Sequence, residues 1–494
     1  MTPADMPALL SAAAVVVAAP LAGAVAVALG FRRGNPRGLA VAATTAALLA
    51  SLTITFLWSR SDGTGVAFGE RLGGGSFVCI DGITAVLLPY VALVELVILL
   101  VAPRRSLEPG AVARILFGAA ATCGLFLTSH PLVLVALWCA TVLPTWISVR
   151  STPGGAGAAR VFAIAMAAAT ACMAVGTVLL VLDPPWSGAS GLAGDAGGWL
   201  VAVAVMIRKG IVPFHSWYPK LFSGATMSTS LAATMPQVAS YTAVRLLIGH
   251  ADHPEGVATE LVVLAQMALV TATYGAALAI VQRSLRSLIG TLAMSQSAMV
   301  LAGLAGTLPM ELNGAFCVWL SSGLALTGIG LVAWALESRA GEIRLETLQG
   351  RFWDAPALAA FFLLFGLSGI GLPGTLSFVA DDLIVSGSLD EQLHAGLLVI
   401  VSTVLCGVAM MRGWFHVFGG PVDPDGPRHS ILVRERVALT MLLAPLFVLG
   451  LWPGPLVRAL DRATSRLLAV PAASAAAAGH PAEVGGLQES PQGR

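Results

Sequence analysis

The sequence predicts an all-α polytopic membrane protein, and three observations support this fold class. Hydrophobic residues make up 57% of the 494 residues, whereas charged residues make up only 11%. Mean hydropathy is +0.85. Apolar runs of about 20 residues, the length at which a helix spans a bilayer, recur from the first ten residues to about residue 458.

Division of these runs at polar loops and helix breakers predicts about fourteen transmembrane helices. We expect them over residues 7–30, 38–58, 80–102, 111–129, 131–149, 160–183, 198–218, 226–249, 257–281, 287–306, 311–336, 354–385, 393–412 and 435–458. The predicted segments are 1–110 with the first three helices, a group at 111–249, a group at 257–420, and 435–470 with the last helix and an interfacial segment. Residues 471–494 carry few large apolar side chains, so a disordered tail is expected there.

Charge and cysteine content exclude several classes of protein. A net charge of +1 without an arginine-rich run argues against a nucleic-acid partner. The six cysteines are scattered singly, so we expect no metal site and no iron–sulfur cluster. No segment has the composition of a soluble nucleotide-binding or redox domain, and we therefore predict no cofactor and no catalytic chemistry in this chain itself.

The loops predict an orientation in the membrane. Basic residues follow the odd-numbered helices, whereas the alternate loops are neutral or acidic. The positive-inside rule then places both termini outside a bacterial-type cytoplasmic (inner) membrane. The basic residues are Arg32, Arg33, Arg37, Arg104, Arg105, Arg150, Lys220, Arg283, Arg286, Arg339, Arg344, Arg351, Arg428, Arg434 and Arg436. Arg458, Arg462 and Arg466 break the rule, which indicates either an interfacial helix or a miscount of helices.

Two of the predicted spans are interrupted by helix breakers. Gly210 and Pro213 lie in the span 198–218, and Gly371, Pro373 and Gly374 lie in the span 354–385. A broken helix frees backbone groups, and in hydrocarbon these need partners from the protein or from a water-filled cavity. Paired breaks at corresponding positions of two halves are typical of transport sites built on internal repeats.

Ionisable residues next to the first break are candidates for a proton path. A buried lysine such as Lys209 can release a proton, whereas Arg208 is a fixed positive charge. His215 follows the break and could shuttle protons, because histidine titrates near pH 6.5. The alternative is structural: these three side chains cap half-helices and satisfy freed carbonyl groups.

Further candidates lie in the third, tenth and twelfth spans. Asp381 and Asp382 follow the second break, and only one can face the bundle interior because adjacent helical residues point about 100° apart. We expect that one to be Asp381. Glu95 is flanked by aliphatic residues and is either a helix-packing group or part of the proton path. Ser295 and Gln296 offer neutral groups that could hold water. Asp81, Arg245 and Arg412 lie nearer span ends and are interpreted as anchors or salt-bridge residues.

Seven segments form a pattern along the chain. They are Asp81-Gly-Ile-Thr-Ala, Pro213-Phe-His-Ser-Trp217-Tyr-Pro219, Ala233-Thr-Met235, Tyr241-Thr-Ala-Val-Arg245, the stretch from Arg286 to Gln296, the stretch from Gly369 to Asp381, and the stretch from Arg412 to Gly420. In composition and order the pattern resembles the antiporter-like, proton-translocating membrane subunits of respiratory complex I (NADH-quinone oxidoreductase). This family is shared with multi-subunit sodium/proton antiporters and membrane-bound hydrogenases.

The resemblance implies a fold and a function. It implies two inverted five-helix repeats, at 111–249 and 257–420, each with a broken helix. It also implies a subunit without redox cofactors that moves protons, or alternatively sodium, along buried ionisable residues. The implied partners are the lipid bilayer, other membrane subunits and an electron-transfer module.

Several positions depart from the family pattern. The span-five glutamate expected after tryptophan is replaced by Cys139, which follows Trp138. Arg208 stands where the span-seven lysine is expected, with Lys209 one residue later. The expected span-eight histidine falls on Leu231 or Ala233, and the expected span-eleven histidine and lysine fall near Val318 and Ser322. Of these ionisable positions, only the acid of the twelfth span keeps its residue type, as Asp381.

Three functions remain compatible with the sequence. The first is a proton-conducting subunit that uses Lys209, His215 and Asp381, with Glu95 in place of the missing span-five acid. The second is a non-pumping scaffold or docking subunit. The third is the membrane partner of a system for uptake of inorganic carbon or another small ion.

Overall fold

The structure is a computed structural model, and it describes residues 5–30, 35–61, 65–69, 75–103, 107–183, 192–248, 259–306, 308–421 and 430–477. Its first half contains α1 (Asp5–Ala28), α2 (Pro36–Ser59), α3 (Gly82–Val101), α4 (Pro109–Phe126), α5 (Pro131–Ser151), α6 (Ala156–Leu182), α7 (Leu192–Lys209), η3 (Phe214–Ser216), α8 (Trp217–Gly224), α9 (Met227–Thr234) and α10 (Val238–Leu246). Its second half contains α11 (Thr259–Ile280), α12 (Leu285–Leu304), α13 (Pro309–Ala340), α14 (Pro356–Gly369), α15 (Leu376–Glu391), α16 (Leu393–Phe418), α17 (Val433–Leu451) and α18 (Gly454–Ala477). A short hairpin pairs β1 (Val66–Phe68) with β2 (Val78–Ile80).

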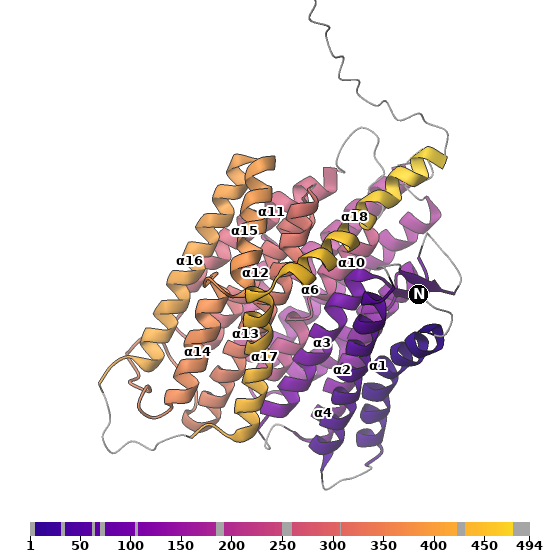
Figure 1. Ribbon diagram of the computed structural model, residues 1–494. Coiled ribbons are helices and arrows are strands. Elements are labelled where there is room, and N and C mark those ends of the chain that lie inside the picture. Colours follow the sequence, from indigo (N-terminus) through magenta and orange to yellow (C-terminus); the bar gives the residue numbers. More distant parts are fainter. Residues whose placement is uncertain are drawn as a thin grey trace, which may run out of the picture.

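The described chain forms a bundle of long, roughly aligned helices, which confirms the predicted all-α polytopic membrane fold (Figure 1). Eleven of its helices are long and apolar enough to cross a membrane, or twelve if α17 and the start of α18 count as one bent span. The predicted spans 226–249, 354–385 and 435–458 are not among the eleven. The structure divides the first two into α9 with α10 and α14 with α15, and α17 lies in the third. The count of about fourteen crossings stays a prediction.

Local sequence signals explain where several helices begin. Asp81 precedes α3, and its side chain accepts a hydrogen bond from the Thr84 backbone N–H at 2.9 Å. Ser284 caps α12 in the same way through the Ser287 N–H. Proline starts α4, α5, α13 and α14, where its missing N–H costs nothing because the first N–H groups of a helix have no intrahelical partner.

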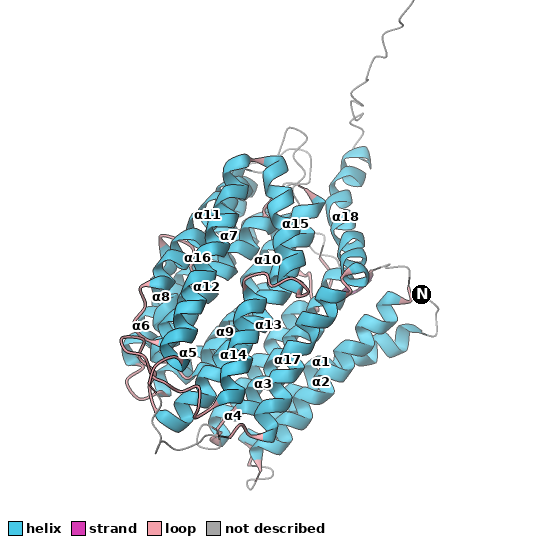
Figure 2. Cartoon of the chain, turned by 60° about the vertical axis from the view of Figure 1, so that its left-hand side comes forward, coloured by secondary structure: helices cyan, strands magenta, loops and turns pink. Residues whose placement is uncertain are grey.

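The helix α13 is the centre of the bundle. All of its most apolar window is buried. It packs against α3, α9, α12, α14, α15, α17 and α18. Figure 2 shows the same bundle from the side, with α13 between α14 and α17 in the view.

The last helix, α18, turns away from the bundle axis. It is bent by 83° relative to α17 and lies across α3 and α13 (Figure 1). Its buried side carries Leu456, Leu460, Ala463 and Thr464, whereas Arg458 and Arg462 are exposed. The interfacial interpretation of these arginines stays a prediction. The helix ends at Ala477, and 478–494, most of the predicted tail, lies outside the described residues.

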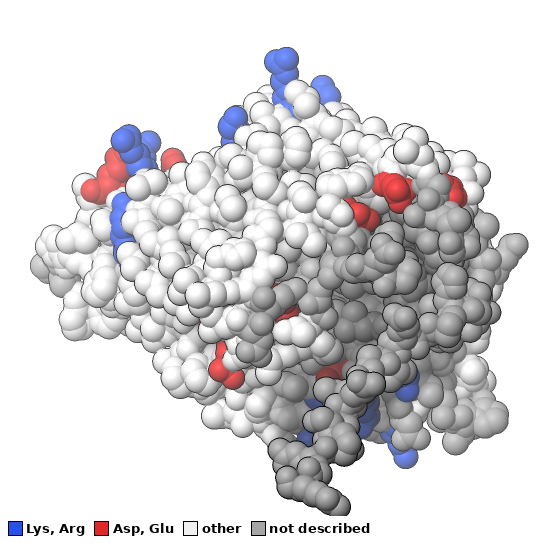
Figure 3. Space-filling model, turned by 90° about the horizontal axis from the view of Figure 1, so that it is seen from above, with Lys and Arg blue, Asp and Glu red and all other residues white. Residues whose placement is uncertain are grey.

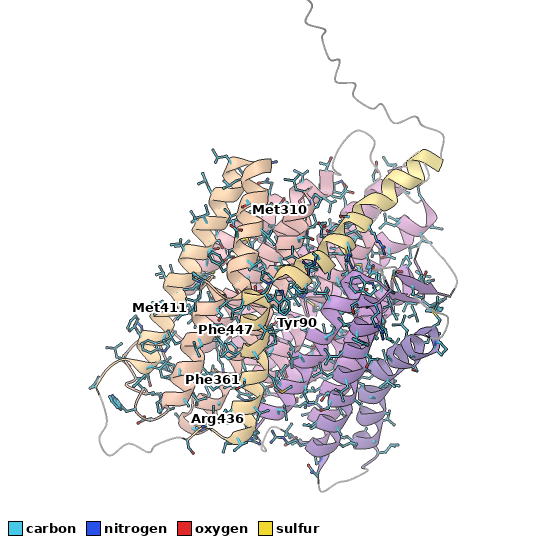
Figure 4. The ribbon with its side chains drawn as sticks, in the orientation of Figure 1. Tyr90, Met310, Phe361, Met411, Arg436 and Phe447 are labelled. Atoms are coloured by element: carbon cyan, nitrogen blue, oxygen red, sulfur yellow. The ribbon has the colours of Figure 1, made fainter. Side chains whose placement is uncertain are left out.

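The two ends of the bundle are separated by an apolar middle. Met310 and Arg436 lie at opposite ends, with Tyr90 between them (Figure 4). Seen from above, onto one end of the bundle, the charged side chains lie mainly toward the rim, and most of the described surface in this view is uncharged (Figure 3). The loop residues Arg32, Arg33, Arg104, Arg105 and Arg428 lie outside the described residues, and the orientation in the membrane remains a prediction.

The predicted anchors Asp81 and Arg245 form an ion pair. Arg245 Nη1 lies 2.5 Å from Asp81 Oδ2, and Nη2 donates to Asp81 Oδ1 at 3.0 Å. The same Nη2 also donates to the Thr84 hydroxyl at 3.0 Å. The pair therefore joins the start of α3 to the end of α10. Arg412 donates to the Gln282 carbonyl and ties α16 to the end of α11.

Candidate functional site

The first helix break lies where the sequence predicted it. The helix α7 ends at Lys209, and Gly210 has φ +69°, a conformation that side-chain-bearing residues rarely adopt. Protein groups satisfy the freed backbone: the Val212 N–H donates to the Thr271 hydroxyl of α11 at 3.0 Å, and the Trp217 indole donates to the Ile207 carbonyl at 2.8 Å. The break is therefore a fixed feature that holds Lys209 in place.

Lys209 is buried and has neutral partners. The residue is only 2% exposed. Its Nζ donates to Gln237 Oε1 at 2.5 Å and to Ser240 Oγ at 2.7 Å. Among the described residues no carboxylate lies within ion-pair distance of it. A lysine held by neutral acceptors can exist with or without its proton, which is what a proton carrier requires.

Gln237 lies at a third helix break, which the sequence analysis did not predict. The break separates α9 from α10, and Gln237 has φ +53°, the only positive φ of a non-glycine residue among the described residues. The Tyr90 hydroxyl of α3 donates to the Met235 carbonyl at 2.7 Å and so satisfies a group that the break frees. The signal was present as Pro236 inside an apolar run.

Lys209 and Glu95 line one cavity. It holds about 60 Å³ of space for water and is also lined by Arg208, Thr141, Tyr218 and Gln237. Glu95, on α3, is 2% exposed, and its Oε2 has no hydrogen-bond partner among the described residues. A cavity of this size with polar walls can hold ordered water. Two ionisable groups separated by water can exchange a proton.

The contacts of Arg208 connect two helices. Its Nη1 donates to the Trp138 carbonyl at 3.2 Å and its Nη2 donates to the Thr141 hydroxyl at 2.6 Å, both on α5. Its guanidinium carbon lies 4.1 Å from the centre of the Trp138 ring. Arg208 thus joins α7 to α5 and places a fixed positive charge on the cavity wall.

His215 lies outside this cavity. It is half-buried in η3, and its Nε2 is 3.4 Å from the Tyr274 hydroxyl of α11. The two rings meet edge-on with centres 5.1 Å apart. The structure therefore separates His215 from Lys209, although the two are only six positions apart in the sequence.

The second break separates α14 from α15. Gly371 and Gly374 have φ +82° and +89°, and the Leu372 N–H donates to the Leu367 carbonyl at 3.1 Å. Asp381 is half-buried beside the break: its Oδ2 is 2.7 Å from the point where a Cβ on Gly371 would lie. Asp382 is exposed. Pro373, the other predicted breaker, is exposed within the break.

The remaining candidates of the second half surround a smaller cavity. Gln296 and Ser322 line it together with Cys406, and it holds about 20 Å³ of space for water. Ser322 donates to the Val318 carbonyl of its own helix at 2.6 Å, and Ser295 donates to the Ala272 carbonyl at 2.7 Å. Asp381 is not part of this cavity wall. The polar groups of the second half are therefore near the break without forming a continuous chain.

The described residues contain no group of three or more His, Cys, Asp or Glu side chains arranged to hold a metal ion. What the arrangement offers chemically is proton exchange between side chains and water.

Comparison with known proteins places these features in a wider group. Residues 162–406, about half of the chain, match the model of the family described as NADH:quinone oxidoreductase/Mrp antiporter, TM. NADH-quinone oxidoreductase subunit M of Mycobacterium tuberculosis is 27% identical over 304 residues, which are 60% of this chain and 54% of that protein. Subunit N of Methylococcus capsulatus is 29% identical over 273 residues, 53% of this chain and 54% of that protein. The chain thus spans about half the length of the curated relatives it matches.

Solved structures share the fold over nearly the whole chain. A chain of respiratory complex I from Thermus thermophilus superposes with a TM-score of 0.82 at 21% identity, covering 93% of this chain and 99% of that one. A chain of the Mrp complex from Dietzia sp. gives 0.81 at 21% identity, covering 92% and 97%.

Proposed function

Because the chain belongs to the NADH:quinone oxidoreductase/Mrp antiporter transmembrane family, we propose that it is a proton-conducting membrane subunit of a multi-subunit assembly of the complex I or Mrp type. The protein moves protons along buried ionisable residues while a partner module supplies the driving reaction. The transported ion is the proton, with sodium as the alternative cation.

One observation carries this proposal: Glu95 and Lys209 line the same cavity, which is large enough to hold water. The sequence lacks the acid that the family places after Trp138, since Cys139 stands there. Glu95 supplies a carboxylate to the cavity from a different helix, α3. In the proposed step the Lys209 ammonium gives a proton to water in the cavity, and the Glu95 carboxylate receives one. Gln237 and Ser240 hold the amine in place in both states.

The rest of the proposed path runs through the second half. His215, which meets Tyr274 of α11, is the proposed link from the first break toward that half. Asp381 beside the second break is the proposed terminal acid, with Ser295, Gln296 and Ser322 as polar groups that hold water near it. Arg208 acts on the path by its fixed charge.

The proposed location is a bacterial-type cytoplasmic membrane with both termini outside. The apolar helices and the basic loop residues support it.

Proton flux in membrane vesicles tests the proposal. We expect Lys209→Ala, Glu95→Gln and Asp381→Asn each to reduce proton movement to background while the protein still assembles in the membrane. Glu346→Gln, which changes an exposed loop carboxylate, is the control and should keep full flux. Normal flux in Lys209→Ala and Asp381→Asn at equal expression contradicts the proposal and favours a scaffold.

The partner module is identified by purification in mild detergent from native membranes followed by mass spectrometry. Flavin, iron–sulfur or hydrogenase subunits in the complex would support a redox-driven pump. Recovery of cation-antiporter subunits alone would support an Mrp-type assembly and direct the flux assay to sodium.

A further inference from the structure

The outward side of α15 carries a regular row of side chains. Phe378, Asp382, Val385 and Leu389 are spaced by four, three and four residues, so they lie on one face of the helix. Phe378 is 48% and Leu389 38% exposed, and Asp382 is exposed between them. The other sides of α15 pack on α13, α16 and α17.

Asp382 lies at a depth where the surrounding surface is apolar. Asp382 lies about 14 Å along the helix axis from the C-terminal end of α15, at the rise of about 1.5 Å per residue. The neighbouring helix α16 exposes Leu397, Ile400 and Val401 in its adjoining half, and α17 exposes Leu451. Figure 2 shows that α15 runs along the bundle and ends near its upper edge.

The described part of the chain gives Asp382 no partner, because it accepts no hydrogen bond and forms no ion pair there. An ionised carboxylate facing hydrocarbon is costly, and ionisable residues in spans almost always face protein or a water-filled cavity. Exposure of the Asp382 carboxylate to lipid would therefore be costly, and a protein partner on this face would remove that cost.

We propose that the outward face of α15 is covered by a transmembrane helix of a neighbouring subunit, and that this helix presents a Lys or Arg to Asp382. Phe378, Val385 and Leu389 pack against the partner helix above and below the ion pair. The spacing of four and three residues is that of a helix–helix seam.

Charge complementarity argues against a second copy of this chain as the occupant. Two copies related by a twofold axis would bring Asp382 against Asp382. Outside α18, the exposed Lys and Arg residues of the described helices lie within five residues of a helix end. They are Arg150, Arg160, Lys220 and Arg436.

Site-specific photo-crosslinking in native membranes tests the proposal. A benzophenone amino acid at Phe378 or Leu389 is expected to crosslink to one and the same membrane protein, in a span that contains Lys or Arg. The matched control is Val175 on α6, which is 52% exposed and should not crosslink to that span. Adducts with lipid alone, or with a second copy of the chain, overturn the proposal.

A charge swap then tests the ion pair itself. Asp382→Lys should lower the crosslinking yield from Phe378 at least about tenfold, and Asp382→Asn should lower it less. Replacement of the partner's basic residue by Asp should restore the yield with Asp382→Lys. An unchanged yield in Asp382→Lys, or no restoration by the swap, contradicts the ion pair.

The contact does not depend on the proton path. Lys209→Ala should leave the crosslink intact, so a failure of the proposed function and a failure of the proposed interface give different results.

Discussion

Gln237 shows how a single neutral residue can hold a buried lysine in place. Its left-handed backbone conformation costs about 1–2 kcal/mol for a residue with a Cβ. In return the third break turns its amide toward α7, where Oε1 accepts from Lys209 Nζ at 2.5 Å. A glycine would fit the backbone with less strain, and the presence of glutamine at this point indicates that the side chain is needed.

A double-mutant cycle tests this role. Gln237→Gly relieves the left-handed strain but removes the acceptor. The net change in the free energy of unfolding is the difference between these two effects, and loss of the acceptor alone should cost about 1–3 kcal/mol. In a Lys209→Met background the same change should cost much less, because no donor remains. Denaturant unfolding in detergent, followed by tryptophan fluorescence, measures both. Equal costs in the two backgrounds would show that the amide does not hold Lys209.

The site residues were predictable from sequence only where they carry charge. Lys209, Glu95 and Asp381 could be recognised because an ionisable side chain in an apolar run is unusual. The neutral Gln237 and Ser240 gave no comparable signal. That Glu95 and Lys209 share a cavity could not be read from the sequence either, since it depends on how α3 packs against α9 and how α7 packs against α10. His215 is only six positions from Lys209 in the sequence, but it lies on the other side of the break.

At the scale of elements, glycine and proline decide where helices are interrupted. The breaks near 210 and 372 each contain at least one glycine with positive φ as well as a proline, and both were predictable. The break between α9 and α10 contains one proline and no glycine, so the apolar pattern continued through it undisturbed. Its conformation depends on a tertiary contact, the hydrogen bond from Tyr90 to the Met235 carbonyl.

Substitution of Gly210 tests how rigid the first break is. Gly210→Ala should lower the free energy of unfolding by at least about 1–2 kcal/mol, because alanine is strained at this positive φ. Its Cβ would also lie only 2.9 Å from the Tyr218 ring.

Gly157→Ala on α6 is the matched control. No atom lies within 4 Å of the new Cβ, and alanine favours the helix, so stability should be unchanged or slightly higher. Thermal unfolding of both variants in the same detergent makes the comparison. Equal behaviour of the two variants would mean that the break adjusts freely.

At the scale of the whole molecule, α18 connects parts that are distant in sequence. It contacts α3 and α13, and the Thr464 hydroxyl donates to Asn313 Oδ1 at 2.9 Å. Both residues are buried. The helix therefore holds the N-terminal helices and the second half together on one side of the bundle.

Loss of this hydrogen bond should destabilise the whole bundle. Thr464→Val keeps the shape but leaves the buried Asn313 amide with one partner fewer, at a cost of about 1–3 kcal/mol. The exposed neighbour Ser465 provides the control, since Ser465→Ala should change stability little. The midpoint of thermal unfolding measures both. If Thr464→Val matches the wild type, the Thr464–Asn313 hydrogen bond does not contribute to the attachment of α18.

The complete enclosure of α13 also constrains how the protein is made. Four of the helices that cover it, α14, α15, α17 and α18, follow it along the chain and leave the ribosome later. During synthesis α13 therefore enters the bilayer with sides still open that later meet protein, including the polar side chain of Asn313. Its final surroundings exist only once the last helix has been added, so in a nascent chain that stops before α17 the sides of α13 that α17 and α18 later cover still lack these contacts.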